Sequence, residues 1–188
     1  MLSKIIKFNQ HGMIIPISIG YEKSEFDLVS KQEKLDYVNS YSKESFSWEY
    51  NGEKIIISDE KVSVYGYPTV DNKYIIIYKG IDGQFKPPNN AVIYNLDGSI
   101  HMILEIPQLI SERAKKYLEK EKLGNPPLEL VKYESGLNFL SFGWRKNENG
   151  EHFNYISIQY DLDYGEGREL NTETGEIGRL IDDWYNYY

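Results

Sequence analysis

The pattern of apolar and polar positions predicts a mainly β chain of short antiparallel strands. The clearest unit spans Tyr74 to Pro107, where the apolar run Tyr74–Lys79 is followed by two β-branched runs, Ala91–Asn95 and Ser99–Ile106. Asp97-Gly98 separates these two runs and is a strong hairpin signal, because both residues tolerate the positive φ of tight turns. We therefore expect the two runs to pair antiparallel, beside the first run.

Strand-like runs joined by glycine-ended turns recur along the rest of the chain. The expected strands are Lys4–Phe8 with Met13–Ile19, Phe46–Tyr50 with Lys54–Ser58, Val62–Tyr65 alone, Leu137–Trp144 with His152–Tyr160, and Arg168–Asn171 with Glu176–Ile177. Asn51-Gly52 predicts a type I′ turn, and the alternation slips near Asn154, where we expect a β-bulge. Such repeated units are typical of an antiparallel β-meander or a curled sheet.

Two short helices are expected, near residues 31–41 and 178–188. Ser30-Lys31-Gln32-Glu33 matches a capping box, and Leu35 and Val38 supply a short apolar stripe behind it. In the terminal stretch, apolar and aromatic residues recur at helical spacing: Leu180, Ile181, Trp184, Tyr185 and Tyr188.

The best-defined helix is expected near residues 107–123. Pro107 stands at the start, where proline is tolerated, and Gly124 with the following prolines ends the helix. The apolar residues that share one face are Ile110, Ala114, Tyr117 and Leu118. The chain is thus expected to be mainly β with an α part, an α+β fold.

Length and composition predict a single domain over residues 1–188, in a reducing compartment. The chain has 188 residues and no cysteine, which excludes a disulfide framework, a thiol nucleophile and a cysteine-ligated metal. The N-terminal residues do not form a signal peptide, and the apolar stretch Met13–Ile19 is too short to span a membrane. We therefore expect a cytoplasmic protein without membrane contact.

The net charge of −8 disfavours nucleic acid as a partner, because nucleic-acid binding depends on Lys and Arg. It favours a basic protein, which the acidic field would steer in. Solubility alone is an alternative reason for this acidity. The 17 tyrosines suit strands and half-exposed interfaces alike.

The residues offer little support for a metal, cofactor or catalytic site. The three histidines are isolated in sequence: His11, His101 and His152. The acidic run from Asp161 to Glu169 begins like a calcium loop, but Glu166 replaces the required glycine and Thr172 the final glutamate. A solvated turn is the simpler interpretation, and paired carboxylates acting on a sugar are the alternative. We expect no cofactor and no metal.

The C-terminal stretch from Asp182 to Tyr188 is the most interface-like, because Trp and Tyr dominate interface hot spots and carboxylates beside them suit a basic partner. The alternative is that these rings dock a terminal helix onto the sheet. The candidate partner-binding residues are Asp182, Asp183, Trp184, Tyr185, Tyr187, Asp161, Asp163, Glu166 and Glu169.

In size, acidity, absence of cysteine and mixture of carboxylates with Tyr and Trp, the chain resembles the bacterial immunity proteins that neutralise polymorphic or contact-dependent toxins. Its bias towards Lys, Asn, Ile and Tyr suits an AT-rich bacterial genome. The resemblance implies an inhibitor whose acidic face covers the basic active site of a toxin domain. Binding would then be tight, fast and salt-sensitive.

Two other functions stay open. One is an interaction module of a larger assembly, which a large exposed apolar patch would favour. The other is a glycan hydrolase that uses Asp161, Asp163 and Glu166 beside Trp144, which requires two carboxylates in a pocket, one with a raised pKa.

Overall fold

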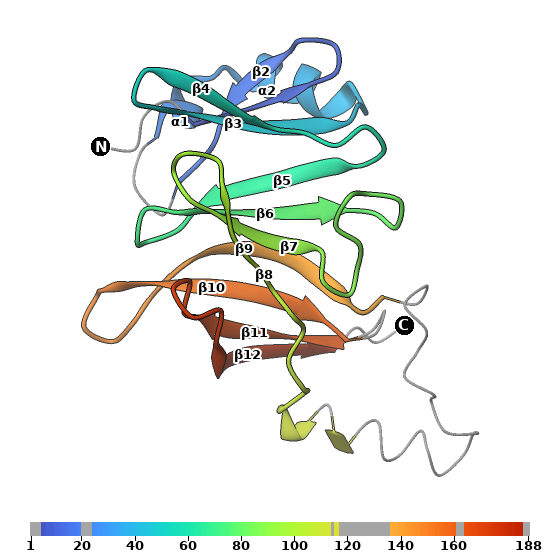
Figure 1. Ribbon diagram of the computed structural model, residues 1–188, viewed down its shortest axis with the longest axis vertical. Helices are drawn as coiled ribbons and strands as arrows, with labels where there is room; N and C mark the ends of the chain where they lie inside the picture. The colour runs from blue at the N-terminus through green and yellow to red at the C-terminus, as the bar shows by residue number, and fades with distance from the viewer. Residues whose placement is uncertain (1–4, 20–23, 114, 117–135, 161–163, 186–188) are drawn as a thin grey trace.

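The computed structural model describes residues 5–19, 24–113, 115–116, 136–160 and 164–185. These residues form three antiparallel four-stranded sheets and two helices, so the predicted mainly β fold is confirmed (Figure 1). In the part of the chain so described, no helix combines the length and apolarity that a bilayer span requires.

Each sheet is built from consecutive strands. The N-terminal sheet has the order β2-β1-β3-β4 and contains β1 (Ile6–Asn9), β2 (Ile14–Pro16), β3 (Glu44–Tyr50) and β4 (Glu53–Ile57). The middle sheet is a meander of β5 (Ser63–Pro68), β6 (Tyr74–Lys79), β7 (Ala91–Tyr94) and β8 (Ile100–Ile103). The C-terminal sheet is a meander of β9 (Asn138–Lys146), β10 (His152–Gln159), β11 (Tyr164–Leu170) and β12 (Ile177–Tyr185).

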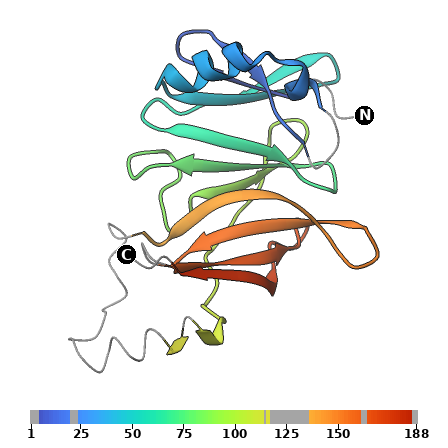
Figure 2. The same ribbon diagram turned by 180° about the vertical axis from the view of Figure 1, so that it is seen from behind.

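The sheets are stacked face to face, and both faces of the middle sheet are covered (Figure 1 and Figure 2). In β6, Ile75 and Ile77 pack in the core shared with the C-terminal sheet, whereas Tyr74 and Ile76 pack in the core shared with the N-terminal sheet. Side chains alternate between the two faces of a strand. A strand between two layers therefore needs an apolar residue at every position, which explains the unbroken run in its sequence.

Several tyrosine side chains are buried in this core and do not lie on the surface. Tyr74 stacks on Trp48 with ring centroids 4.2 Å apart, and the hydroxyls of Tyr78 and Tyr94 share a buried 2.9 Å hydrogen bond. The indole of Trp48 donates to the carbonyl of Leu96 at 2.7 Å. The hydroxyls of Tyr78 and Tyr94 and the indole N–H of Trp48 thus have partners, as buried polar groups require.

The local turn and capping signals are confirmed. Asp97-Gly98 connects β7 to β8, and the pairing with β6 is as predicted. Asn51 and Gly52 have φ values of 51° and 82°, as a type I′ turn requires. The expected bulge lies between Ser157 and Ile158 rather than at Asn154.

Helix α2 (Lys31–Asn39) begins at the predicted capping box, but its apolar stripe does not face the core. Leu35 is 45% and Val38 65% exposed, and Tyr37 is the buried residue of the helix. A short helix, α1 (Glu25–Leu28), precedes it and has its own capping box between Ser24 and Asp27. The polar sequence of this stretch predicts a loop instead, and that prediction is wrong for these four residues. Both helices lie on the outer side of the N-terminal sheet (Figure 1).

The predicted terminal helix, residues 178–188, is wrong. Its described part belongs to β12, which pairs antiparallel with β11 after the turn at Gly175. Two register shifts interrupt this pairing, one of them where Ile181 lies opposite no residue of β11. Such bulges break strand alternation, and the resulting irregular spacing of apolar residues resembles a helical period.

The helix predicted near residues 107–123 begins later than Pro107. Helical backbone begins at Glu112, and the Lys115 N–H donates to the Ser111 carbonyl at 3.0 Å. Before it, the carbonyls of Pro107 and Gln108 accept hydrogen bonds from side chains of the C-terminal sheet. These contacts hold the first residues in a non-helical conformation. Ala114 and the predicted residues from 117 onward lie outside the described residues.

Candidate functional site

All of the described candidate residues lie in strands β11 and β12 of the C-terminal sheet, and several of them make contacts within the protein. Residues 164–170 form strand β11, so the prediction of a solvated turn across Glu166 and Glu169 is wrong. Three candidates lie outside the described residues: Asp161, Asp163 and Tyr187. For Tyr185 only the backbone is described, and it pairs with Tyr164.

Glu166 is fully buried and presents no surface to a partner. Its Oε1 accepts hydrogen bonds from the N–H groups of Ile110 at 2.8 Å and Ser111 at 2.5 Å. Its Oε2 lies 3.5 Å from a guanidinium nitrogen of Arg168, which also donates to the Gln108 carbonyl. Glu166 therefore anchors the segment that precedes the helix at Glu112.

Asp183 has a similar internal role. It accepts a hydrogen bond from the Ser111 hydroxyl, and its Oδ1 lies 2.9 Å from the guanidinium of Arg113. The same guanidinium donates to the Asp183 carbonyl at 3.1 Å. Asp183 thus fastens the helical segment to the edge strand β12.

Trp184 and Asp182 lie on the face of β11 opposite to Glu166. A Cβ on Gly165 would lie 2.2 Å from the Trp184 ring, and a Cβ on Gly167 would lie 2.0 Å from the Tyr155 hydroxyl. The two glycines therefore let aromatic side chains lie directly against the strand. Asp182 is exposed and accepts the Tyr155 hydroxyl at 2.8 Å.

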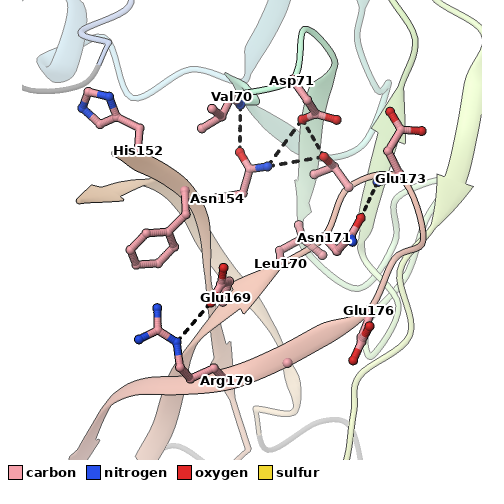
Figure 3. Close-up of a pocket in the computed structure, with 13 residues that line it drawn as sticks. Val70, Asp71, His152, Asn154, Glu169, Leu170, Asn171, Glu173, Glu176 and Arg179 are labelled. Atoms are coloured by element: carbon pink, nitrogen blue, oxygen red, sulfur yellow. Dashed lines mark hydrogen bonds and ion pairs between the residues drawn. The ribbon is translucent and has the colours of Figure 1, made fainter. Parts of the chain in front are cut away.

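A hollow of about 510 Å³ opens where the β5–β6 turn meets the β11–β12 turn (Figure 3). Its lining includes Glu169, the one described candidate residue in the groove, and three carboxylates that sequence reasoning missed: Asp71, Glu173 and Glu176. We call this hollow the acidic groove. Each missed carboxylate lies in or beside a turn, and nothing in its sequence neighbourhood indicates which distant turn it meets.

Buried polar groups hold one wall of the acidic groove in place (Figure 3). The Asn154 side chain accepts the Val70 N–H at 2.8 Å and donates to Asp71 at 3.4 Å and to Thr172 at 3.3 Å. The Thr172 hydroxyl donates to Asp71 at 2.5 Å. Burial raises the pKa of Asp71, but hydrogen bonds from Thr172, Thr69 and Lys73 outweigh it and lower this pKa to about 2.

Lys73 joins the two turns electrostatically. Its ammonium lies 3.0 Å from Asp71 and also forms an ion pair with Glu173. Burial alone would lower the pKa of Lys73, but these two carboxylates outweigh burial and raise it. The Glu173 carbonyl lies 3.2 Å from Nε2 of His101 in β8. The middle and C-terminal sheets are therefore linked at the acidic groove.

An arginine lies on the opposite wall. Nε of Arg179 is 3.1 Å from Oε2 of Glu169 (Figure 3). The Arg179 guanidinium lies 5.5 Å from the centre of the Phe153 ring. A second hollow, of about 480 Å³, is also lined by Phe153 and Arg179. The Phe153 ring and the Arg179 guanidinium therefore lie between the acidic groove and this second hollow.

Side chains hydrogen-bond to some of the outward-facing backbone groups at both edges of the C-terminal sheet. At β9, Asn90 bonds the N–H and the carbonyl of Phe139, while Lys79 and Tyr65 donate to the carbonyls of Leu140 and Phe142. At β12, Arg113 donates to the carbonyl of Asp183. Such contacts oppose the addition of a further strand.

No group of three or more His, Asp or Glu side chains among the described residues is arranged to hold a metal ion. Comparison with protein-family models, with curated proteins and with solved structures finds no match for this chain. The function is therefore inferred from geometry and charge.

Proposed function

We propose that this chain is a small acidic binding protein that inhibits a basic partner protein by covering the partner's site, in the manner of an immunity protein. The charge of the acidic groove carries the proposal. Four carboxylates and the Arg179 guanidinium line the groove, and the buried Lys73 ammonium pairs with two of the carboxylates, so a negative excess remains in a chain of net charge −8. A site of this kind attracts a basic surface and accelerates its association.

The hydrogen-bonded wall of the acidic groove supports the same function. Asn154, Thr172 and Lys73 are buried, and their hydrogen bonds hold Asp71 and Glu173 in position. A preformed site loses little conformational entropy on binding, which favours tight association. Because side chains already bond part of each edge of the C-terminal sheet, we infer that the partner meets this hollowed surface and does not add a strand.

The test is a charge reversal in the groove with a matched reversal elsewhere. Glu176 and Glu53 are both exposed, and Glu53 lies in β4 of the N-terminal sheet. Glu176→Lys and Glu53→Lys change the net charge equally. The tagged protein and both variants are incubated with lysate of the source cells at low and high salt, and the retained partner is purified and assayed for inhibition.

We expect a basic partner that is retained at low salt, weakened at high salt, inhibited by the natural chain and by Glu53→Lys, and released by Glu176→Lys. Equal loss with both variants would show that overall charge, and not the groove, is responsible. Retention of a partner whose activity is unchanged would refute inhibition.

An interaction module is the second candidate, because three apolar side chains in or just after the helices are exposed: Leu28 by 86%, Val38 by 65% and Tyr41 by 90%. Apolar contacts persist at high salt, whereas contacts at the acidic groove weaken. If this second function holds, Leu28→Ser with Val38→Ser will release a partner that is retained at high salt. The control Ile81→Ser, at another exposed position, will not.

The hydrolase alternative has little support. Glu166 is buried against backbone amides, and the Trp144 indole is bound to the Pro68 carbonyl at 2.9 Å. In the acidic groove, the pKa of Asp71 is lowered to about 2, opposite to the raised pKa of a general acid.

A further inference from the structure

We propose that the acidic groove contains a subsite for one arginine side chain of the partner, and that Arg179 occupies this subsite in the free protein. The inference rests on the proposed function and specifies its partner chemistry. It predicts that the partner inserts an arginine over Phe153 and pairs it with Glu169, while Arg179 moves aside.

The subsite is defined by an aromatic face beside a carboxylate. The guanidinium of Arg179 contacts both, at 5.5 Å from the Phe153 ring centre and 3.1 Å from Glu169. A ring face and a carboxylate together are the groups that recognise a guanidinium, through cation–π attraction and charge-assisted hydrogen bonds. The chain's own arginine thus demonstrates which chemistry this position accepts.

The internal arginine is held weakly enough to be displaced. Its side chain is 62% exposed and that of Glu169 is 40% exposed, so water screens their attraction. Open space lies on both sides of the ring, in the acidic groove and in the neighbouring hollow of about 480 Å³. A second guanidinium therefore has a route to the ring, and Arg179 has room to leave it.

The geometry selects arginine over lysine. A planar guanidinium stacks on a ring and pairs with a carboxylate at the same time, whereas an ammonium is a compact and strongly hydrated point charge. Of the remaining carboxylates, Asp71 and Glu173 share the ammonium of Lys73, and Glu176 adds a further negative charge. Together they leave a net negative field that favours further basic residues around the inserted arginine.

The test uses hexa-arginine and hexa-lysine peptides with the full chain, and dissociation constants measured by calorimetry at fixed salt. Arg179→Ala removes the internal occupant. Lys61→Ala removes one positive charge at another exposed position and serves as the matched control. Circular dichroism checks that each variant is folded.

We expect Arg179→Ala to bind hexa-arginine at least threefold more tightly than Lys61→Ala does, and Arg179→Ala with Phe153→Leu to lose this gain. Hexa-lysine should show no such difference between Arg179→Ala and Lys61→Ala. An equal gain for both peptides, or no gain over Lys61→Ala, would overturn the subsite. The proposed function would still stand if the Glu176→Lys variant released an inhibited basic partner, so the two failures are distinguishable.

Discussion

The side-chain amide of Asn90 makes both hydrogen bonds that a neighbouring strand would make to Phe139. Its Oδ1 accepts the Phe139 N–H at 2.9 Å, and its Nδ2 donates to the Phe139 carbonyl at 3.1 Å. Both residues are buried, and the same Nδ2 also donates to the carbonyl of Tyr78. One side chain thus joins the middle sheet to the edge of the C-terminal sheet.

Replacement of Asn90 by alanine should lower the free energy of unfolding by about 3 kcal/mol, because buried backbone groups of Phe139 lose their partners. Urea unfolding measures the change. Asn149→Ala, at an exposed turn position, is the control and should change stability by less than about 0.5 kcal/mol. Equal effects of the two substitutions would contradict the bridging role of Asn90.

Glu166→Gln should destabilise the fold by about 3 kcal/mol, because it leaves the buried guanidinium of Arg168 without its carboxylate. It should also loosen the segment that Glu166 anchors, which trypsin will reveal as faster cleavage after Arg113 or Lys115. The control, Glu169→Gln, removes an exposed pair and should cost less than about 1 kcal/mol. Unchanged cleavage in the Glu166 variant would show that the anchor is not required.

Asp71 predicts a pH dependence of stability. Its pKa is lowered in the folded chain from 3.8 to about 2, so the charged form stabilises the fold above about pH 4. As the pH falls from 3.8 through about 2, this contribution is lost. The natural chain should therefore be more stable than Asp71→Asn at pH 7, and the difference should shrink towards zero near pH 2.

Urea unfolding of both proteins at pH 7, 4 and 2.5 measures this difference. The comparison with Asp71→Asn is needed because other carboxylates also titrate in this range. A difference that is the same at all three pH values would show that the charge of Asp71 does not stabilise the fold.

The sequence by itself determined the local elements. Asn51-Gly52 and Asp97-Gly98 specify turns, and Ser30 with Glu33 specifies the start of α2, because backbone preferences and neighbouring hydrogen bonds decide these features. The apolar run Tyr74–Lys79 also indicated a strand beside the hairpin. These signals were sufficient to predict a mainly β antiparallel fold.

Only the tertiary structure decided the conformation and burial of the C-terminal residues, and which residues line the acidic groove. The stretch beginning at Ile177 became a strand because β11 offered a partner for its backbone, and Glu166 became an internal anchor because the segment before Glu112 covers it. Thr172 and Asp71 lie 101 residues apart yet share a hydrogen bond. Such a contact cannot be predicted from local sequence, because the stacking of the sheets brings the two turns together.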